Sequence, residues 1–332
     1  MRYEKKFFIL KFVIISFIGY GQEIKGIIFD SNKDPIFGAS VYFNGTSIGT
    51  ISRDDGSFSI GTPSDNSIPL IISFLGFETV FITNYSFLTE PLKIQLNESN
   101  QELDEVIIET DTWSREKKLR EFREVFLGTT SPALECKILN EDAIKLTYKP
   151  SQGILIAYAN EPLVIKNKFL GYVVNYNLQN FKIQYETPPN GFQFITSTYY
   201  DGFTFFEELK KSTSKKHTDN RKLSYEGSLL HFFRSIYKKE LIENKFKIYE
   251  NRKEVLPYSK IKVSMENDLA TVELLSKDLI IMFNNSLQST LISKEIFYID
   301  KYGNHSPPDA ITVGGNLAIR KLAFLLPLEY GL

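Results

Sequence analysis

The sequence predicts an all-β sandwich followed by a larger α+β domain with antiparallel strands. From residue 24 to about residue 97, short apolar segments alternate with turn residues, and no segment keeps a helical spacing of apolar side chains. From Trp113 onward, segments with helical spacing alternate with β-like segments. The 332 residues are enough for two ordinary domains. We therefore expect a sandwich over residues 22–97 and an α+β domain over residues 113–332.

The first 21 residues have the layout of a secretory signal peptide. The basic sequence MRYEKK precedes an apolar stretch that ends in small residues before Gln22. The uninterrupted apolar run is shorter than the roughly 20 residues that a membrane-spanning helix needs. We expect residues 1–21 to be removed and the chain to be exported, to the periplasm, the outer membrane or the medium. Cys136 is the single cysteine, which excludes an intramolecular disulfide.

Five motifs follow one another in the first domain, with the sequences IKGIIFD, PIFGASV, GTSIGT, DGSFSI and ISFLGF. Their order resembles the carboxypeptidase-regulatory-like domain of Bacteroidota surface proteins. That family also forms the N-terminal extension of TonB-dependent receptors. The resemblance implies a transthyretin-like β-sandwich and a place in the cell envelope.

Zinc peptidase chemistry is not expected, although the family name refers to carboxypeptidases. Zinc peptidases of that kind hold the metal with a His-x-x-Glu pair and a distant histidine. None of the three histidines, His217, His231 and His305, has the required glutamate. Ser47 lies in a G-x-S-x-G match that is followed by a turn and a strand, where a nucleophile elbow needs a helix. The sequence from Asp30 to Asp34 begins like a calcium loop but continues with proline, so we interpret it as a turn.

The residues between the two domains are acidic. Residues 98–112 contain six acidic side chains and no basic one, which is typical of a solvated linker. We expect a protease to cut this linker and to leave two folded fragments. Beyond it, the apolar spacing from Trp113 to Gly128 predicts an amphipathic helix. A second helix is expected within residues 225–244 and a short one before Pro327, with antiparallel strands between the helices.

The second domain carries further motifs, including FLG at residue 126, PLVIKNKFLGY at residue 162, and YEGSLLHFFRS at residue 225. They resemble the C-terminal part of uncharacterised secreted Bacteroidota proteins that carry the regulatory-like module, and this implies architecture and compartment only. Cys136 lies in a pattern typical of a half-buried strand, and His231 lies beside two phenylalanines, as in a packed core. The basic stretch Lys210–Lys222 is interpreted as a solvated loop, with binding of anionic lipid, lipopolysaccharide or nucleic acid as the alternative.

We find no catalytic constellation and predict no catalytic, cofactor-binding or metal-ligating residues and no cofactor. Lys and Arg total 39 against 40 Asp and Glu, so no global charge favours nucleic acid. The leading hypothesis is a non-enzymatic binding or scaffolding protein of the periplasm or outer membrane, with a protein or glycan of the envelope as partner. Peripheral association with the outer membrane stays open. The alternative is an envelope hydrolase acting on peptide or glycan through carboxylates such as Glu186, Asp201, Glu207 and Glu208.

Overall fold

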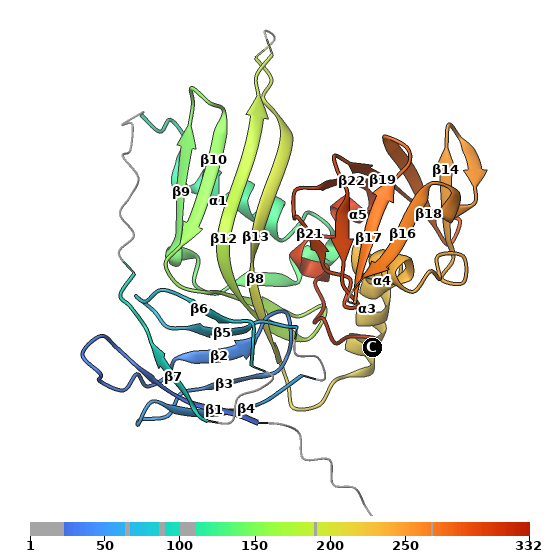
Figure 1. The fold of residues 1–332 in the computed structure, drawn as a ribbon. Helices are drawn as coiled ribbons and strands as arrows, with labels where there is room; N and C mark the ends of the chain where they lie inside the picture. Colours follow the sequence, from blue (N-terminus) through green and yellow to red (C-terminus); the bar gives the residue numbers. More distant parts are fainter. Residues whose placement is uncertain (1–22, 64–66, 86–89, 100–109, 189–190, 267) are drawn as a thin grey trace, which may run out of the picture.

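The structure is a computed structural model that describes residues 23–63, 67–85, 90–99, 110–188, 191–266 and 268–332. Figure 1 shows the β-sandwich at one end, a large sheet above it, and a second group of sheets beside that sheet. The expected signal peptide, and most of the expected linker, lie outside the described residues. None of the described helices is long and apolar enough to cross a membrane.

The N-terminal region is a sandwich of two sheets, as the sequence predicts. One sheet has the order β4-β1-β7 and the other β3-β2-β5-β6. Every second residue of β1 is buried, because one face of that strand covers the core. Between the sheets lie fully buried side chains such as Ile28, Val41 and Leu70. The strands are β1 (Glu23–Phe29), β2 (Ser40–Phe43), β3 (Gly49–Ile51), β4 (Ser57–Gly61), β5 (Leu70–Ser73), β6 (Val80–Ile82) and β7 (Leu92–Gln95).

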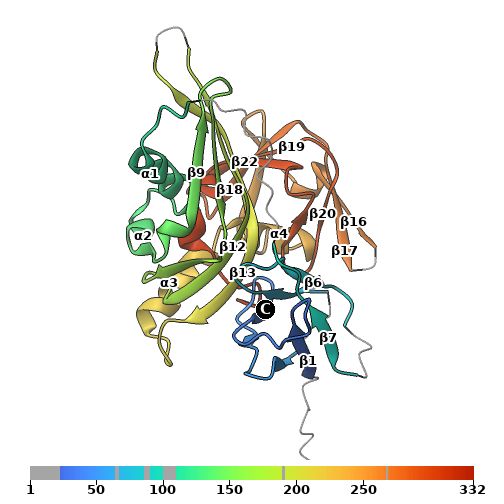
Figure 2. The same cartoon turned by 90° about the vertical axis from the view of Figure 1, so that its left-hand side faces the viewer.

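The middle region is a six-stranded sheet with helices on one face. The predicted amphipathic helix is α1 (Arg115–Phe126), which begins after Ser114, whose hydroxyl caps it by accepting a hydrogen bond from the Lys117 N–H. Phe122 and Phe126 pack against aromatic rings of the sheet. The other elements are α2 (Ser131–Leu134), β8 (Cys136–Ile138), β9 (Ile144–Lys149), β10 (Ile154–Ala159), β11 (Leu163–Asn167), β12 (Tyr172–Glu186) and β13 (Phe194–Glu208). Figure 2 shows α1 and α2 outside this sheet.

The hairpin of β12 and β13 is the longest feature of the sheet. Each strand has 15 residues, and the two pair along their whole length with two irregularities in register. On its other side β12 pairs with β11 and β10, so β13 forms the edge of the sheet. Figure 1 shows the hairpin extending beyond the neighbouring strands.

The last region has a hydrophobic core of its own, built around α4 (Leu229–Tyr237) and two antiparallel sheets. One sheet has the order β15-β14-β18-β19-β22 and the other β16-β17-β20-β21. The chain enters this region through α3 (Lys215–Tyr225), which packs against the middle region. The other elements are β14 (Phe246–Glu250), β15 (Lys253–Val255), β16 (Ile261–Glu266), β17 (Leu269–Leu274), β18 (Asp278–Phe283), β19 (Leu287–Ser293), β20 (Phe297–Ile299), β21 (His305–Ser306), β22 (Ile311–Gly315) and α5 (Asn316–Ile319). Residues 113–332 therefore contain two hydrophobic cores.

The stretch Lys210–Lys222 is mostly exposed, as expected, but the interpretation of it as a loop is wrong for residues 215–222. Its second half lies in α3, where Ser214 caps the helix by accepting a hydrogen bond from the His217 N–H. Arg221 is buried and makes a bidentate ion pair with Glu208, with both N···O distances at 2.8 Å. The helix is held by this ion pair and its cap, and it lacks the apolar stripe that reveals helices in a sequence.

Candidate functional site

His231 and His305 pack against aromatic rings in the last region, whereas His217 lies in the first turn of α3. His231 is buried, accepts a hydrogen bond at Nδ1 from the Gly227 N–H, and packs against the rings of Tyr225 and Phe246. Burial lowers the pKa of His231. The ring of His305 packs against Phe233, and burial likewise lowers its pKa. The described residues contain no group of three or more His, Cys, Asp or Glu side chains that is arranged to hold a metal ion.

Cys136 has the half-buried position in a strand that its neighbours predict. Its Sγ lies 3.5 Å from the Pro132 carbonyl oxygen. Burial, with a smaller contribution from Glu135, raises the pKa of the thiol to about 12. The side chain is therefore a thiol at neutral pH, and a thiol is a poor nucleophile.

The four carboxylates of the hydrolase hypothesis do not converge. Glu186 pairs with Phe194 at one end of the hairpin and Glu208 lies at the other, roughly 45 Å away at about 3.3 Å per residue. Glycosidase carboxylates work roughly 5 to 10 Å apart. Asp201 accepts hydrogen bonds from Asn180 and Tyr199, at 2.8 and 2.6 Å, which ties it to the surface of the hairpin. Glu207 accepts one from Asn175, and Glu208 is paired with Arg221.

The structure instead brings the sandwich against the rest of the chain. The loop between β2 and β3 lies along the lower edge of β13, where the Gly45 N–H donates to the Thr204 carbonyl at 2.7 Å. The Phe206 N–H donates to the Thr46 carbonyl at 3.0 Å, and Thr46 forms a parallel bridge with Phe205. The Asn44 side chain accepts a further hydrogen bond from the Thr204 N–H. The loop thus adds a short strand-like segment to the edge of the six-stranded sheet.

The same loop binds the C-terminal segment. The Leu328 N–H donates to the Gly45 carbonyl at 2.7 Å. One carboxylate oxygen of Glu329 accepts hydrogen bonds from both the N–H and the hydroxyl of Ser47, at 2.7 and 2.5 Å. Ser47, the serine of the G-x-S-x-G match, is therefore a contact between the two regions. The other oxygen of Glu329 is buried and has no hydrogen-bond partner among the described residues.

Two glycines of this loop leave room for the contact. A Cβ atom on Gly49 would lie 2.4 Å from Cε2 of Phe205, and one on Gly45 would lie 2.7 Å from Cδ1 of Leu328. Gly45 also has a φ of +73°, which disfavours a side chain. Glycine at each of these positions is typical of a turn or of a close strand crossing, and here both lie against side chains of other regions of the chain.

Aromatic side chains add to these contacts between the sandwich and the rest of the chain, which we call the junction. Phe205 packs against Tyr42 with ring centroids 5.5 Å apart, and Phe203 packs against Phe81 at 4.7 Å. Tyr302, from the last region, is 5% exposed and belongs to the core of the sandwich. The sandwich core is therefore completed by a residue from the other end of the chain.

Arg234 of α4 fixes the segment that meets the sandwich. It is 2% exposed, and its guanidinium donates to the carbonyl oxygens of Tyr302, Leu328 and Tyr330, at 2.9, 2.5 and 2.5 Å. These acceptors lie in the loop before β21 and in the C-terminal segment. One buried side chain thus positions both Tyr302 and Glu329.

A separate cleft of about 580 Å³ opens beside β14 in the last region. Its lining includes Lys245, Asn284 and Asn285, whose side chains form no hydrogen bond or ion pair with another described residue. The neighbouring Lys247 is paired with Glu254 at 3.1 Å. The lining also includes two exposed apolar side chains, Ile242 and Leu256. A cation and two amides beside an apolar wall suit a polar small ligand or a sugar.

Comparison with known proteins addresses the first region. Residues 24–108 match the CarboxypepD_reg-like domain. The TonB-dependent receptor SusC of Bacteroides thetaiotaomicron is 29% identical over 98 residues, which is 29% of this chain and 9% of the receptor.

Among solved structures, a type II cohesin-X-dockerin complex from Acetivibrio cellulolyticus aligns with a TM-score of 0.19 and 23% identity. The alignment covers 23% of this chain and 52% of that one. The family that the order of motifs predicts is confirmed by the match of the sequence: residues 24–108 of this chain are a CarboxypepD_reg-like domain.

Proposed function

We propose that this chain is a non-enzymatic binding or scaffolding protein of the cell envelope, in which the CarboxypepD_reg-like sandwich acts as an interaction module. The observation that carries the proposal is the junction itself. The GTSIGT loop binds the edge of a strand through main-chain hydrogen bonds, and its serine binds a carboxylate. A loop with this chemistry is suited to holding polypeptide.

Two further observations support binding over hydrolysis. The carboxylates named for hydrolysis are spread along the two paired 15-residue strands β12 and β13. The rings of His231 and His305 are packed against aromatic side chains. The similarity to SusC supports an envelope location and export. For a glycan partner, the cleft at Lys245, Asn284 and Asn285 offers unpaired polar groups beside apolar surface.

The proposal is tested with the purified chain and isolated envelopes. We expect saturable co-sedimentation with outer-membrane fragments or peptidoglycan, without release of soluble sugars or peptides as followed by mass spectrometry. The variants Lys245→Ala and Asn284→Ala test a glycan partner, with Lys277→Ala as a matched control outside the lining of the cleft. Release of fragments that grows with time, or recovery of the chain in the cytosol after cell fractionation, would overturn the proposal.

A further inference from the structure

The upper part of the β13 edge has hydrogen-bonding groups that no described segment uses. In an antiparallel strand, alternate residues direct their N–H and C=O to the same side. Thr204 and Phe206 direct theirs outward, to the loop of the sandwich. The first irregularity in register places its extra residue on β12, so the alternation along β13 is not interrupted there. The next outward residues toward the N-terminal end of β13 are therefore Gly202, Tyr200 and Thr198. Within the described part of the chain, none of their outward groups has a backbone partner.

From Thr198 to Gly202 this edge lacks the features that usually prevent pairing with other chains, and the second irregularity in register, between Ser197 and Ile195, lies beyond that run. Natural edge strands are shortened, or carry proline, lysine or β-bulges, or are covered. The sequence from Phe194 to Phe203, FITSTYYDGF, contains neither proline nor lysine. Its one charged side chain, Asp201, is held by hydrogen bonds from Asn180 and Tyr199.

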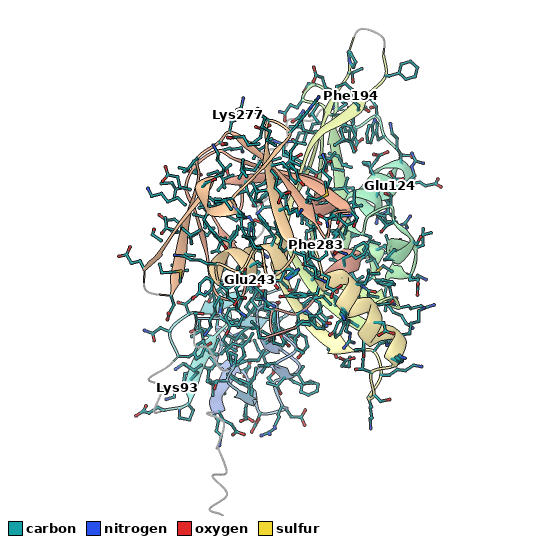
Figure 3. All side chains as sticks on the ribbon, turned by 90° about the vertical axis from the view of Figure 1, so that its right-hand side faces the viewer. Lys93, Glu124, Phe194, Glu243, Lys277 and Phe283 are labelled. Carbon is teal, nitrogen blue, oxygen red and sulfur yellow. The ribbon has the colours of Figure 1, made fainter. Side chains whose placement is uncertain are left out.

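Apolar side chains gather at the same end of the strand. Phe194 is 50% exposed, Ile195 43% and Tyr199 37%. Figure 3 shows Phe194 at the tip of the hairpin, at the opposite end of the molecule from Lys93 of the sandwich. Exposed aromatic and β-branched residues next to unpaired main-chain groups are the two parts of a strand-addition site, where pairing gives affinity and alternate side chains give specificity.

We infer that the β13 edge from Phe194 to Gly202 binds an extended polypeptide segment of a partner protein by strand addition. The lower part of this edge already shows the mode of binding, because residues 44–46 of the sandwich lie on it as a short added strand. The outward groups from Gly202 to Thr198 continue that interface directly, over four residue steps or about 13 Å. The inference rests on the proposed function, since it gives the binding protein a class of partner.

The probe is a phage-displayed library of random 12-residue peptides, selected on the purified full chain. We expect enriched peptides with apolar residues at alternate positions. On binding, a synthetic copy should slow hydrogen exchange of the amides of Thr198, Tyr200 and Gly202. The replacement Thr198→Pro removes an outward N–H and leaves the pairing with β12 intact, so it should weaken binding at least tenfold. Thr198→Val keeps the N–H and should bind as the original chain does.

Side-chain specificity is tested by Phe194→Ser, with Leu256→Ser as the control, because Leu256 is 73% exposed in the separate cleft. Phe194→Ser should weaken peptide binding severalfold and Leu256→Ser should not. The inference is overturned if no peptide is enriched, if Thr198→Pro binds normally, or if the protected amides lie in the cleft. It is also overturned if the edge pairs with a second copy of the chain, which would be seen as a dimer that Thr198→Pro abolishes. The same holds if Phe194→Ser weakens binding to phosphatidylethanolamine vesicles but not binding to the peptide. Because the purified chain is used, these results do not depend on where the cell places it.

Discussion

Ser47 and Glu329 are 282 residues apart in the sequence, and the Glu329 carboxylate accepts two hydrogen bonds from Ser47. The contact joins the loop of the CarboxypepD_reg-like domain to the C-terminal segment. We expect Ser47→Ala and Glu329→Gln each to lower the free energy of unfolding by about 1 kcal/mol, because Ser47 is exposed and water replaces part of the interaction.

A double-mutant cycle measures whether the two residues act together. In urea unfolding, the combined variant should be less destabilised than the sum of the two single variants. Additive effects would show that the two side chains contribute independently.

The Phe205 ring packs directly on Gly49, and this predicts a sharp effect of a single methyl group. In Gly49→Ala the new Cβ would lie 2.4 Å from the ring, so Phe205 has to move away from the sandwich. We expect a loss of about 1 to 3 kcal/mol and faster hydrogen exchange of the Phe206 amide. Gly61→Ala is the matched control, because a Cβ there meets nothing within 4 Å. Equal stability of the two variants would contradict the packing.

Arg234 is predicted to be the most sensitive charged residue at the junction. Replacing it by methionine leaves three carbonyl oxygens without their donor, those of Tyr302, Leu328 and Tyr330. Each unsatisfied buried acceptor costs about 1 to 3 kcal/mol, so Arg234→Met should lower the free energy of unfolding by at least about 3 kcal/mol. Arg53→Met, at an exposed position, should change it little. Denaturant unfolding monitored by the single tryptophan makes the comparison.

The burial of His231 predicts that the folded chain loses stability at mildly acidic pH. Burial lowers its pKa in the folded chain, whereas the unfolded chain binds a proton near pH 6.5. The unfolded state therefore binds more protons below that pH, and the free energy of unfolding decreases as the pH falls from about 7 to 5. His231→Asn keeps an acceptor for the Gly227 N–H but does not titrate. Its stability should therefore depend less on pH over this range than that of the original chain.

The sequence predicted those features that have a local pattern. The order of five motifs predicted the sandwich, and the apolar stripe from Trp113 to Gly128 predicted α1. Helix α3 was missed because it has no apolar stripe: its buried side chains include Arg221, which is paired with Glu208. Such an ion pair leaves no periodic pattern in the sequence. The contact of Ser47 with Glu329 has no local signal apart from the neighbouring glycines, since its partners come from opposite ends of the chain.

The junction also revises what proteolysis between the two regions should produce. The acidic composition of residues 98–112 led us to expect two separately folded fragments. In the structure Tyr302 fills the sandwich core, and the GTSIGT loop binds both β13 and the C-terminal segment. We therefore expect the fragments of a chain cut between residues 100 and 109 to remain associated in gel filtration and to unfold in one transition.

Variants of the junction connect this result to its cause. With the cut in place, the fragments are held together only by non-covalent contacts, so Gly49→Ala should shift the association toward free fragments, and Gly61→Ala should not. Tyr302→Ala should act in the same direction, because it leaves a cavity in the sandwich core. Fragments that separate at micromolar concentration and then melt cooperatively on their own would show that the sandwich closes its core without Tyr302.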